Sequence, residues 1–251
     1  MYPVLFKIGT IEIQSYTFFL ILGILIGLWV AILEARRYNS TIFQIFIVGI
    51  CVIPFAYIMA IVNGWIFAFR YDIFLETGQI LYPGGLISFG VILGALFMGK
   101  ICAKFLKLPV EQVLDPIVLA LAIILGVLRI GCLLNGCCYG METNSFLGMV
   151  LPGDYGIWAN RYPTQIMLCI LNLGLFAWLW FHRTKKPFDT YLVLHYLIIY
   201  SIGRLIIDSF RDLPYIWGQI SPYHLFSLII LIVAWYFYFK KKKLVTGLQI
   251  S

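Results

Sequence analysis

Charge is scarce in this chain. Only 12% of its 251 residues are Asp, Glu, Lys or Arg, which is roughly half the share found in a typical soluble domain. Ser- or Gly-rich linkers, low-complexity tracts and internal repeats are also missing. Hydrophobic residues instead make up 62% of the sequence. The composition therefore excludes an ordinary soluble core and favours an all-α polytopic membrane protein.

Seven apolar stretches, each of about 18–25 residues, are long enough to cross a bilayer. We expect transmembrane helices near 16–35, 42–64, 84–105, 113–130, 163–182, 190–208 and 222–239. No basic segment precedes the first stretch and no small-residue cleavage site follows it, so it is predicted to be a retained span. Residues 1–15 alternate partly, which predicts a hairpin or a short amphipathic piece. One domain is expected over 1–251, with a small extracytoplasmic head near 131–162.

Basic residues gather in every second connection between these stretches. Twelve of the eighteen Lys and Arg residues fall at 36–37, 100–107, 183–186 and 240–243. Cytoplasmic loops of membrane proteins carry an excess of Lys and Arg, so the N-terminus is predicted outside and the C-terminus in the cytoplasm. The same clusters account for the net charge of +7. They can rest on anionic lipid headgroups and do not indicate nucleic-acid binding.

The remaining basic residues lie on the other side or within the membrane: Lys7, Arg70, Arg129, Arg161, Arg204 and Arg211. A charged residue inside the bilayer costs about 2.5–3.5 kcal/mol on insertion scales, so such residues usually serve a site. Several guanidinium groups that converge at the outer face would bind phosphate well, because their planar forks match its oxygens. A lipid headgroup is the nearest phosphate at that depth.

Four motifs surround most of these arginines. They are YPGGLISFG at 82–90, RIGCLLNGCCYG at 129–140, NRYPTQ at 160–165 and GRLIIDSFR at 203–211. In the last motif Arg204 and Asp208 are four residues apart and share one helical face, with Arg211 one turn later. Simpler interpretations stay open for each motif: helix packing at Gly84–Gly85, a snorkelling Arg129, an interfacial Arg161 and an isolated Arg204–Asp208 ion pair.

The order and spacing of these motifs resemble the prolipoprotein diacylglyceryl transferases, the first enzymes of bacterial lipoprotein maturation. The resemblance also includes Tyr16 in the first stretch. It implies a bacterial cell-membrane enzyme that moves the diacylglyceryl group of phosphatidylglycerol onto a prolipoprotein cysteine and releases glycerol phosphate. The implied partners are the phospholipid, the prolipoprotein or another thiol acceptor, and the membrane. No cofactor is expected.

Several family residues are replaced in this chain. The histidine of the family's HGGL motif is Pro83, and the Asn and Glu of its glycine-rich signature are Cys132 and Cys137. The His of the family's RHPSQ block is Tyr162, and its sixth-span Glu is Asp208. The arginines are retained. The phosphate-binding half of the site is therefore expected to be kept, and the proton-handling half to be replaced.

The predicted site follows from these motifs. Arg129, Arg204 and Arg211 are expected to hold the lipid phosphate and stabilise the leaving group. An attacking thiol must become a thiolate, for which Asp208 or His224 is the candidate base. The catalytic candidates are Arg129, Arg204, Asp208, Cys137 and His224. The substrate-binding candidates are Tyr16, Gly84, Gly85, Cys132, Asn135, Gly140, Arg161, Gln165 and Arg211.

The cysteines of the glycine-rich motif, Cys132, Cys137 and Cys138, admit three interpretations. Cys132 or Cys137 beside Arg129 could be a low-pKa nucleophile that carries the lipid fragment. A disulfide would suit the oxidising outer side. A metal site is less favoured, because three cysteines without a nearby His form an incomplete zinc set. An anion transporter or lipid flippase is the non-enzymatic alternative, although no duplicated pair of broken helices is present.

Overall fold

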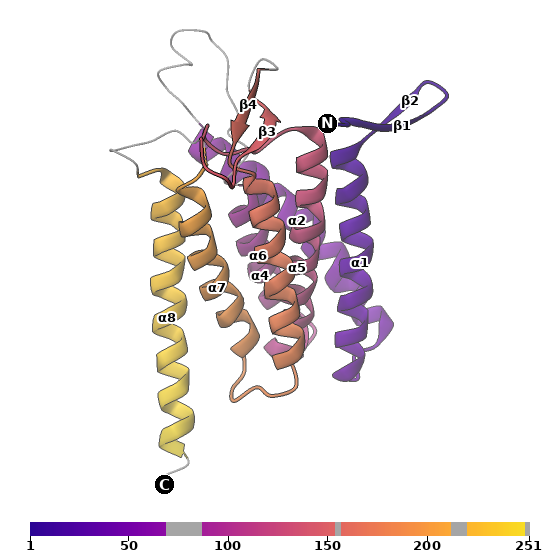
Figure 1. Cartoon of the computed structure of the whole chain (residues 1–251). Coiled ribbons are helices and arrows are strands. Elements are labelled where there is room, and N and C mark those ends of the chain that lie inside the picture. The colour runs from indigo at the N-terminus through magenta and orange to yellow at the C-terminus, as the bar shows by residue number, and fades with distance from the viewer. Residues whose placement is uncertain (69–86, 154–156, 212–219, 249–251) are drawn as a thin grey trace. The chain divides into compact units, whose positions relative to one another are not determined.

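A computed structural model of the protein describes residues 1–68, 87–153, 157–211 and 220–248. Within these residues seven helices are long and apolar enough to cross a membrane. They are α1 (Ser15–Arg37), α2 (Ile42–Ala68), α4 (Ile87–Phe105), α5 (Val110–Asn135), α6 (Thr164–His182), α7 (Tyr191–Asp208) and α8 (Pro222–Leu248) (Figure 1). The expected all-α polytopic membrane protein is confirmed.

The chain forms two compact units, which are described separately. Unit 1 comprises Met1–Trp29 with Leu119–Ser251, and unit 2 comprises Val30–Val118. The long helices α1 and α5 therefore contribute to both units. The grouping of residues 1–251 into one domain, with a head near 131–162, stays a prediction.

In unit 2, α2 and α4 pack closely through small residues. A Cβ atom added at Gly90 would lie 2.6 Å from the Met59 carbonyl oxygen. Such close approach between helix backbones is what glycine permits in membrane proteins. A buried carboxylate accepts a hydrogen bond nearby, from the Tyr38 hydroxyl to Asp115 Oδ2 at 2.6 Å. The loop between α1 and α2 is thereby tied to the start of α5.

In unit 1, the first part of α1 packs on the second part of α5. A Cβ atom at Gly23 would lie 3.2 Å from the Ile124 carbonyl oxygen, and one at Gly131 would lie 2.9 Å from Phe19 Cβ. Before α1, strands β1 (Val4–Ile8) and β2 (Ile11–Gln14) pair antiparallel. The hairpin predicted for residues 1–15 is therefore confirmed.

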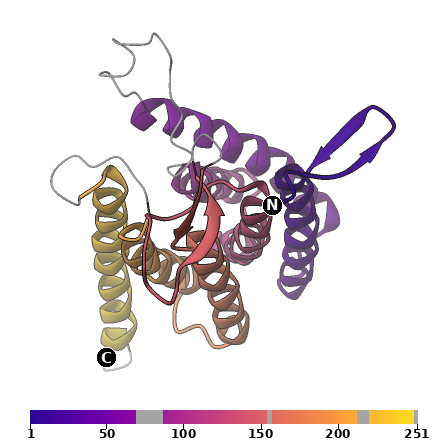
Figure 2. The ribbon, with the colours of Figure 1, turned by 45° about the horizontal axis from the view of Figure 1, so that its top comes forward.

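The ends of α5 and α7 and the starts of α6 and α8 lie at one end of unit 1 (Figure 1). Strands β3 (Met149–Pro152) and β4 (Trp158–Arg161) pair antiparallel, with Met149 opposite Arg161. Figure 2 looks toward this end and shows the β3–β4 pair in front of the helix ends of the same unit. This end of unit 1 carries three of the four sequence motifs.

Helices α5 and α8 continue furthest beyond their predicted ends. Helix α5 was expected to end near residue 130 but continues to Asn135, because Gly131 packs inside the helix against α1 instead of breaking it. Helix α8 was expected to end near residue 239 but continues to Leu248 through four lysines. Lysine is a good helix former, so the helix continues beyond its apolar part.

Candidate active site

Helix α5 ends in a Schellman motif. The Gly136 N–H donates to the Leu133 carbonyl at 3.2 Å, and the Cys137 N–H donates to the Cys132 carbonyl at 3.1 Å. These are the two hydrogen bonds that define the motif, and the left-handed φ of 74° at Gly136 is one that glycine adopts readily. The turn brings Cys137 next to Cys132, whose carbonyl also accepts from the Cys137 thiol at 3.7 Å.

Three sulfur atoms meet at this turn. Cys138 follows with a left-handed φ of 63°, and the Sγ atoms of Cys132, Cys137 and Cys138 all lie within 4.8 Å of one another. All six cysteines lie in described parts of the chain and are free, so the disulfide interpretation is not realised here. Hydrogen bonding with Cys132, and then with Cys137, holds the pKa of the Cys138 thiol well below its ordinary value.

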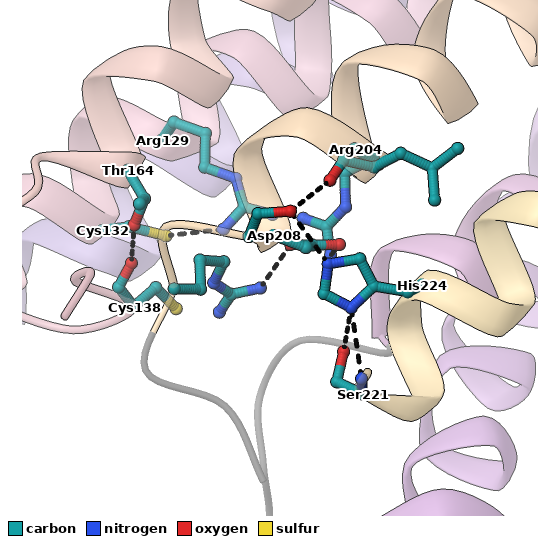
Figure 3. A network of polar contacts seen from close by, with 11 residues as sticks. Arg129, Cys132, Cys138, Thr164, Arg204, Asp208, Ser221 and His224 are labelled. Carbon is teal, nitrogen blue, oxygen red and sulfur yellow. Dashed lines mark hydrogen bonds and ion pairs between the residues drawn. The ribbon is translucent and has the colours of Figure 1, made fainter. Parts of the chain in front are cut away.

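The first turn of α6 holds the backbone of this turn. Thr164 Oγ1 donates to the Cys138 carbonyl at 2.8 Å, and Gln165 Nε2 donates to the Cys137 carbonyl at 2.8 Å. Figure 3 shows Thr164 above Cys138, joined by this bond. Both side chains are buried. The sequence singled out Gln165 but missed Thr164, although Thr164 belongs to the same NRYPTQ motif.

The three motifs of unit 1 cross at Gly140. Its N–H donates to the Tyr162 carbonyl at 2.9 Å, and the next N–H, of Met141, donates to the Phe210 carbonyl at 2.9 Å. A Cβ atom at Gly140 would lie only 2.5 Å from the Phe210 carbonyl oxygen. Glycine is therefore required where the segment after α5 passes between the start of α6 and the end of α7.

Asp208 is shared by two guanidinium groups. Arg204 Nη2 lies 3.0 Å from Asp208 Oδ2, and Arg211 Nη1 lies 3.5 Å from Asp208 Oδ1. All three side chains are buried. Figure 3 shows the Arg204 side chain turned toward Asp208. The shared helical face inferred from the spacing of Arg204 and Asp208 is thus present.

Arg129 brings a third positive charge to this buried region. It is 5% exposed, and its Nη1 donates to Cys132 Sγ at 3.9 Å. Burial, followed by repulsion from Arg204, lowers the pKa of Arg211; Arg129 adds to the repulsion and Asp208 opposes it. Arg204 and Arg211 share one carboxylate, and Arg129 adds a further positive charge near Arg211, so a bound anion would be stabilised here.

Two further predicted residues lie beside this cluster. Tyr16 in α1 interacts electrostatically with Cys132 and Arg129, and the Asn135 side chain hydrogen-bonds Cys137. Gly84 and Gly85 lie outside the described residues. The substrate-binding roles of all four stay predictions.

Arg161 is held by the β3–β4 region. Its Nη2 lies 2.7 Å from Glu142 Oε1, and its Cζ lies 4.8 Å from the centre of the Tyr139 ring. These contacts join the segment after α5 to strand β4. Neither contact involves Asp208, so the substrate-binding role predicted for Arg161 does not depend on the Asp208 cluster. That role stays a prediction.

His224 caps the start of α8. The Ser209 hydroxyl donates to the Leu205 carbonyl at 3.0 Å, so His224 Nε2, 3.2 Å away, donates to Ser209. Nδ1 then accepts from the Ser221 N–H at 3.2 Å and from the Ser221 hydroxyl at 2.7 Å. The bond from the Ser221 N–H to the His224 side chain corresponds to one half of a capping box, with His in place of Glu. The Ser221 hydroxyl bonds the same ring nitrogen instead of accepting from a backbone N–H. The predicted role of His224 as a base stays a prediction.

A cavity of about 300 Å³ lies beside His224. Its walls are mostly leucine and isoleucine side chains from α7 and the start of α8, such as Leu205 and Leu228. This lining suits hydrocarbon better than a charged group.

Comparisons with known proteins indicate the family. The family model for prolipoprotein diacylglyceryl transferase matches residues 3–240. The chain is 33% identical over 244 residues to phosphatidylglycerol-prolipoprotein diacylglyceryl transferase 2 of Clostridium perfringens, which covers 91% of each chain. It is 32% identical over 226 residues to the transferase of Clostridium tetani (85% of this chain, 87% of the relative). It is 26% identical over 232 residues to that of Clostridioides difficile (90% of each).

These relatives are bacterial, and the described helices span a membrane repeatedly. The expectation of a multi-pass bacterial membrane protein is therefore confirmed. The match extends over almost the whole chain and includes the three motifs that meet at Gly140. The protein belongs to the prolipoprotein diacylglyceryl transferase family.

Proposed function

We propose that the protein transfers the diacylglyceryl group of phosphatidylglycerol to the cysteine thiol of a prolipoprotein. The observation that carries the proposal is a set of three buried arginines in unit 1. Arg204 and Arg211 share the Asp208 carboxylate, and Arg129 lies close enough to Arg211 to repel it. The names of the relatives give the substrates of those proteins, and in this proposal the arginine cluster binds the lipid phosphate. The lysine and arginine clusters support placing this end of unit 1 at the outer face of the membrane.

The reaction is a displacement at carbon. The acceptor sulfur attacks the methylene carbon that joins the diacylglyceryl group to the phosphate. A sulfur–carbon bond forms, the carbon–oxygen bond breaks, and its electron pair goes to the phosphate oxygen. The products are the thioether and glycerol phosphate, and the thiol proton leaves to solvent. Negative charge grows on the leaving phosphate, so preorganised guanidiniums lower the barrier.

Asp208 acts in this scheme as a positioning residue. It lies between Arg204 and Arg211, and a carboxylate paired with arginines is a weak base. Its contribution is to orient two planar guanidiniums toward one phosphate. The same pairing lowers the net positive charge that must be buried when no lipid is bound.

The test uses the full-length protein in detergent with labelled phosphatidylglycerol and a lipobox peptide. Replacing Arg129 or Arg204 with Ala is expected to lower kcat/KM by about 100-fold or more, the usual effect of removing a group that stabilises a transition-state anion. Arg204→Lys keeps the charge and loses the planar fork, so it should still be strongly impaired. Arg36→Ala, at an exposed position in the last turn of α1, is the matched control.

Release of glycerol phosphate decides between the functional classes. An enzyme yields this product together with the lipidated peptide, whereas a transporter or flippase moves the lipid without cleaving it. Unchanged turnover in both Arg129→Ala and Arg204→Ala would contradict the proposed phosphate site. A lipid adduct on Cys137 that vanishes in Cys137→Ser would instead support a covalent route through the enzyme's own thiol.

A further inference from the structure

The displacement described above leaves the three-sulfur cluster without a role. Cys132, Cys137 and Cys138 present their Sγ atoms within 4.8 Å of one another. Cys132 is buried, and the other two are partly accessible. Arg129 lies 3.9 Å from Cys132 Sγ, so the cluster adjoins the proposed phosphate site.

The backbone holds these sulfurs in place before any ligand binds. The Schellman motif sets Cys137 beside Cys132, and the left-handed Cys138 turns the chain back toward them. Thr164 and Gln165 fix the carbonyl groups of Cys138 and Cys137. A site supported by such contacts loses little conformational freedom when a ligand joins the three side chains.

The arrangement fits a thiophilic cation. Zinc–sulfur bonds of about 2.3 Å place two ligand sulfurs of a tetrahedral site roughly 3.8 Å apart, so the observed cluster needs only a small contraction. Three thiolates and one Zn²⁺ carry a net charge of −1, which the adjacent Arg129 guanidinium offsets. The absence of a histidine argued against zinc at the level of sequence. The close approach of the three sulfur atoms favours zinc instead, because a catalytic zinc site needs three protein ligands and an open position.

We infer that Cys132, Cys137 and Cys138 bind one Zn²⁺ ion, and that the fourth coordination position receives the acceptor thiol. Within the ranges that the structure describes, no fourth His, Cys, Asp or Glu side chain belongs to this group. The inference rests on the proposed function for the identity of the acceptor. It supplies a means of thiol activation in a chain where Pro83 stands in place of the histidine of the family motif.

The step balances without a change in oxidation state. The acceptor thiol replaces a zinc-bound water and binds as thiolate, and its proton leaves with solvent. The thiolate sulfur then attacks the diacylglyceryl carbon, and the carbon–oxygen electron pair goes to the phosphate held by the arginines. The resulting thioether is a weaker zinc ligand than a thiolate, so it leaves and water returns.

The first experiment measures metal in the full-length protein purified in detergent without chelators. About one zinc per chain is expected, with a loss of at least tenfold in Cys132→Ser, Cys137→Ser and Cys138→Ser. Cys169→Ser is the matched control, because Cys169 is partly buried and free but lies in α6 outside the cluster. No zinc after incubation with Zn²⁺ alone, full retention in Cys137→Ser, or a Cys132–Cys137 disulfide in the fresh protein would overturn the inference.

The second experiment replaces zinc with Co²⁺ in the unaltered chain, so it does not depend on the folding of a variant. Sulfur-to-cobalt charge-transfer bands and intense tetrahedral ligand-field bands are expected. A lipobox peptide should change these bands, and its Cys→Ser form should not. An unchanged spectrum with the Cys peptide would overturn the open position. Neither measurement uses phosphatidylglycerol, so their failure would contradict this inference while leaving the proposed function intact. Lipid transfer that persists after the metal is removed would also contradict the inference without contradicting the proposed function.

Discussion

Replacing Asp208 with Asn tests whether the buried arginines need a negative partner. The change keeps the size of the side chain but removes the charge that faces Arg204 at 3.0 Å and Arg211 at 3.5 Å. All three side chains are buried. Breaking a buried ion pair by removing one partner costs about 3–5 kcal/mol. For a chain of this length, each kcal/mol shifts the unfolding midpoint by about 2–4 °C, so a fall of roughly 6–20 °C is expected.

Glu142→Gln is the matched control for this prediction. Its ion pair with Arg161 is shorter, at 2.7 Å, but the Glu142 side chain is 65% exposed. Arg161 is buried, but solvent at the exposed Glu142 carboxylate screens the pair. Its contribution is therefore about 1 kcal/mol or less, and this midpoint should fall by less than about 4 °C. Burial, and not the length of the contact, is what separates the two variants.

The assay is thermal unfolding in detergent, followed by intrinsic tryptophan fluorescence, with and without phosphatidylglycerol. Asp208→Asn leaves Arg204 and Arg211 without their shared carboxylate, so the anionic lipid should raise its midpoint more than that of the unaltered protein. Equal losses in Asp208→Asn and Glu142→Gln would refute the argument from burial. A midpoint for Asp208→Asn within about 2 °C of the unaltered protein would refute the need for charge compensation.

Three further predictions concern positions around the site and in unit 2. Gly140→Ala should cost about 1–3 kcal/mol of stability in the same unfolding assay, because its Cβ would meet a backbone carbonyl. Gly174→Ala is the control: a Cβ there would have nothing within 4 Å, so this variant should be neutral or stabilising. Ser221→Ala and His224→Ala should each cost about 0.5–2 kcal/mol, and the double variant should lose little more than either alone; additive losses would argue against a shared cap. Tyr38→Phe removes a hydrogen bond to buried Asp115 and should cost about 1.5–3 kcal/mol while leaving lipid transfer by the folded protein unchanged; an unchanged midpoint would contradict this.

The sequence predicted the helices well because hydropathy and length determine them directly. The spacing of Arg204 and Asp208 also sufficed to place them on one face, since neighbours four apart on a helix touch. The end of α5 was harder. Gly131 suggested a break, but glycine in a membrane helix also permits close packing, and only the contact with Phe19 distinguishes the two cases.

The contacts that hold the site depend on loop paths, which no periodicity reveals. Thr164 and Gln165 bond to carbonyls of residues more than twenty positions earlier, and the sequence contains no signal for that pairing. The cap at Ser221 and His224 is different. A Ser followed three residues later by an acceptor side chain is a helix-start pattern, so it could have been read as a cap from SPYH alone.

The placement of Arg204 and Asp208 on successive turns has a consequence for biogenesis. Because α7 carries its own counterion, the segment can leave the translocon as a neutral pair without waiting for another helix. Arg129 has no acidic residue within the second half of α5, but it lies close to the helix end and can reach the headgroups during synthesis. The order of assembly would then bring α5 and α7 together only after both have crossed, which is when the excess positive charge first becomes concentrated.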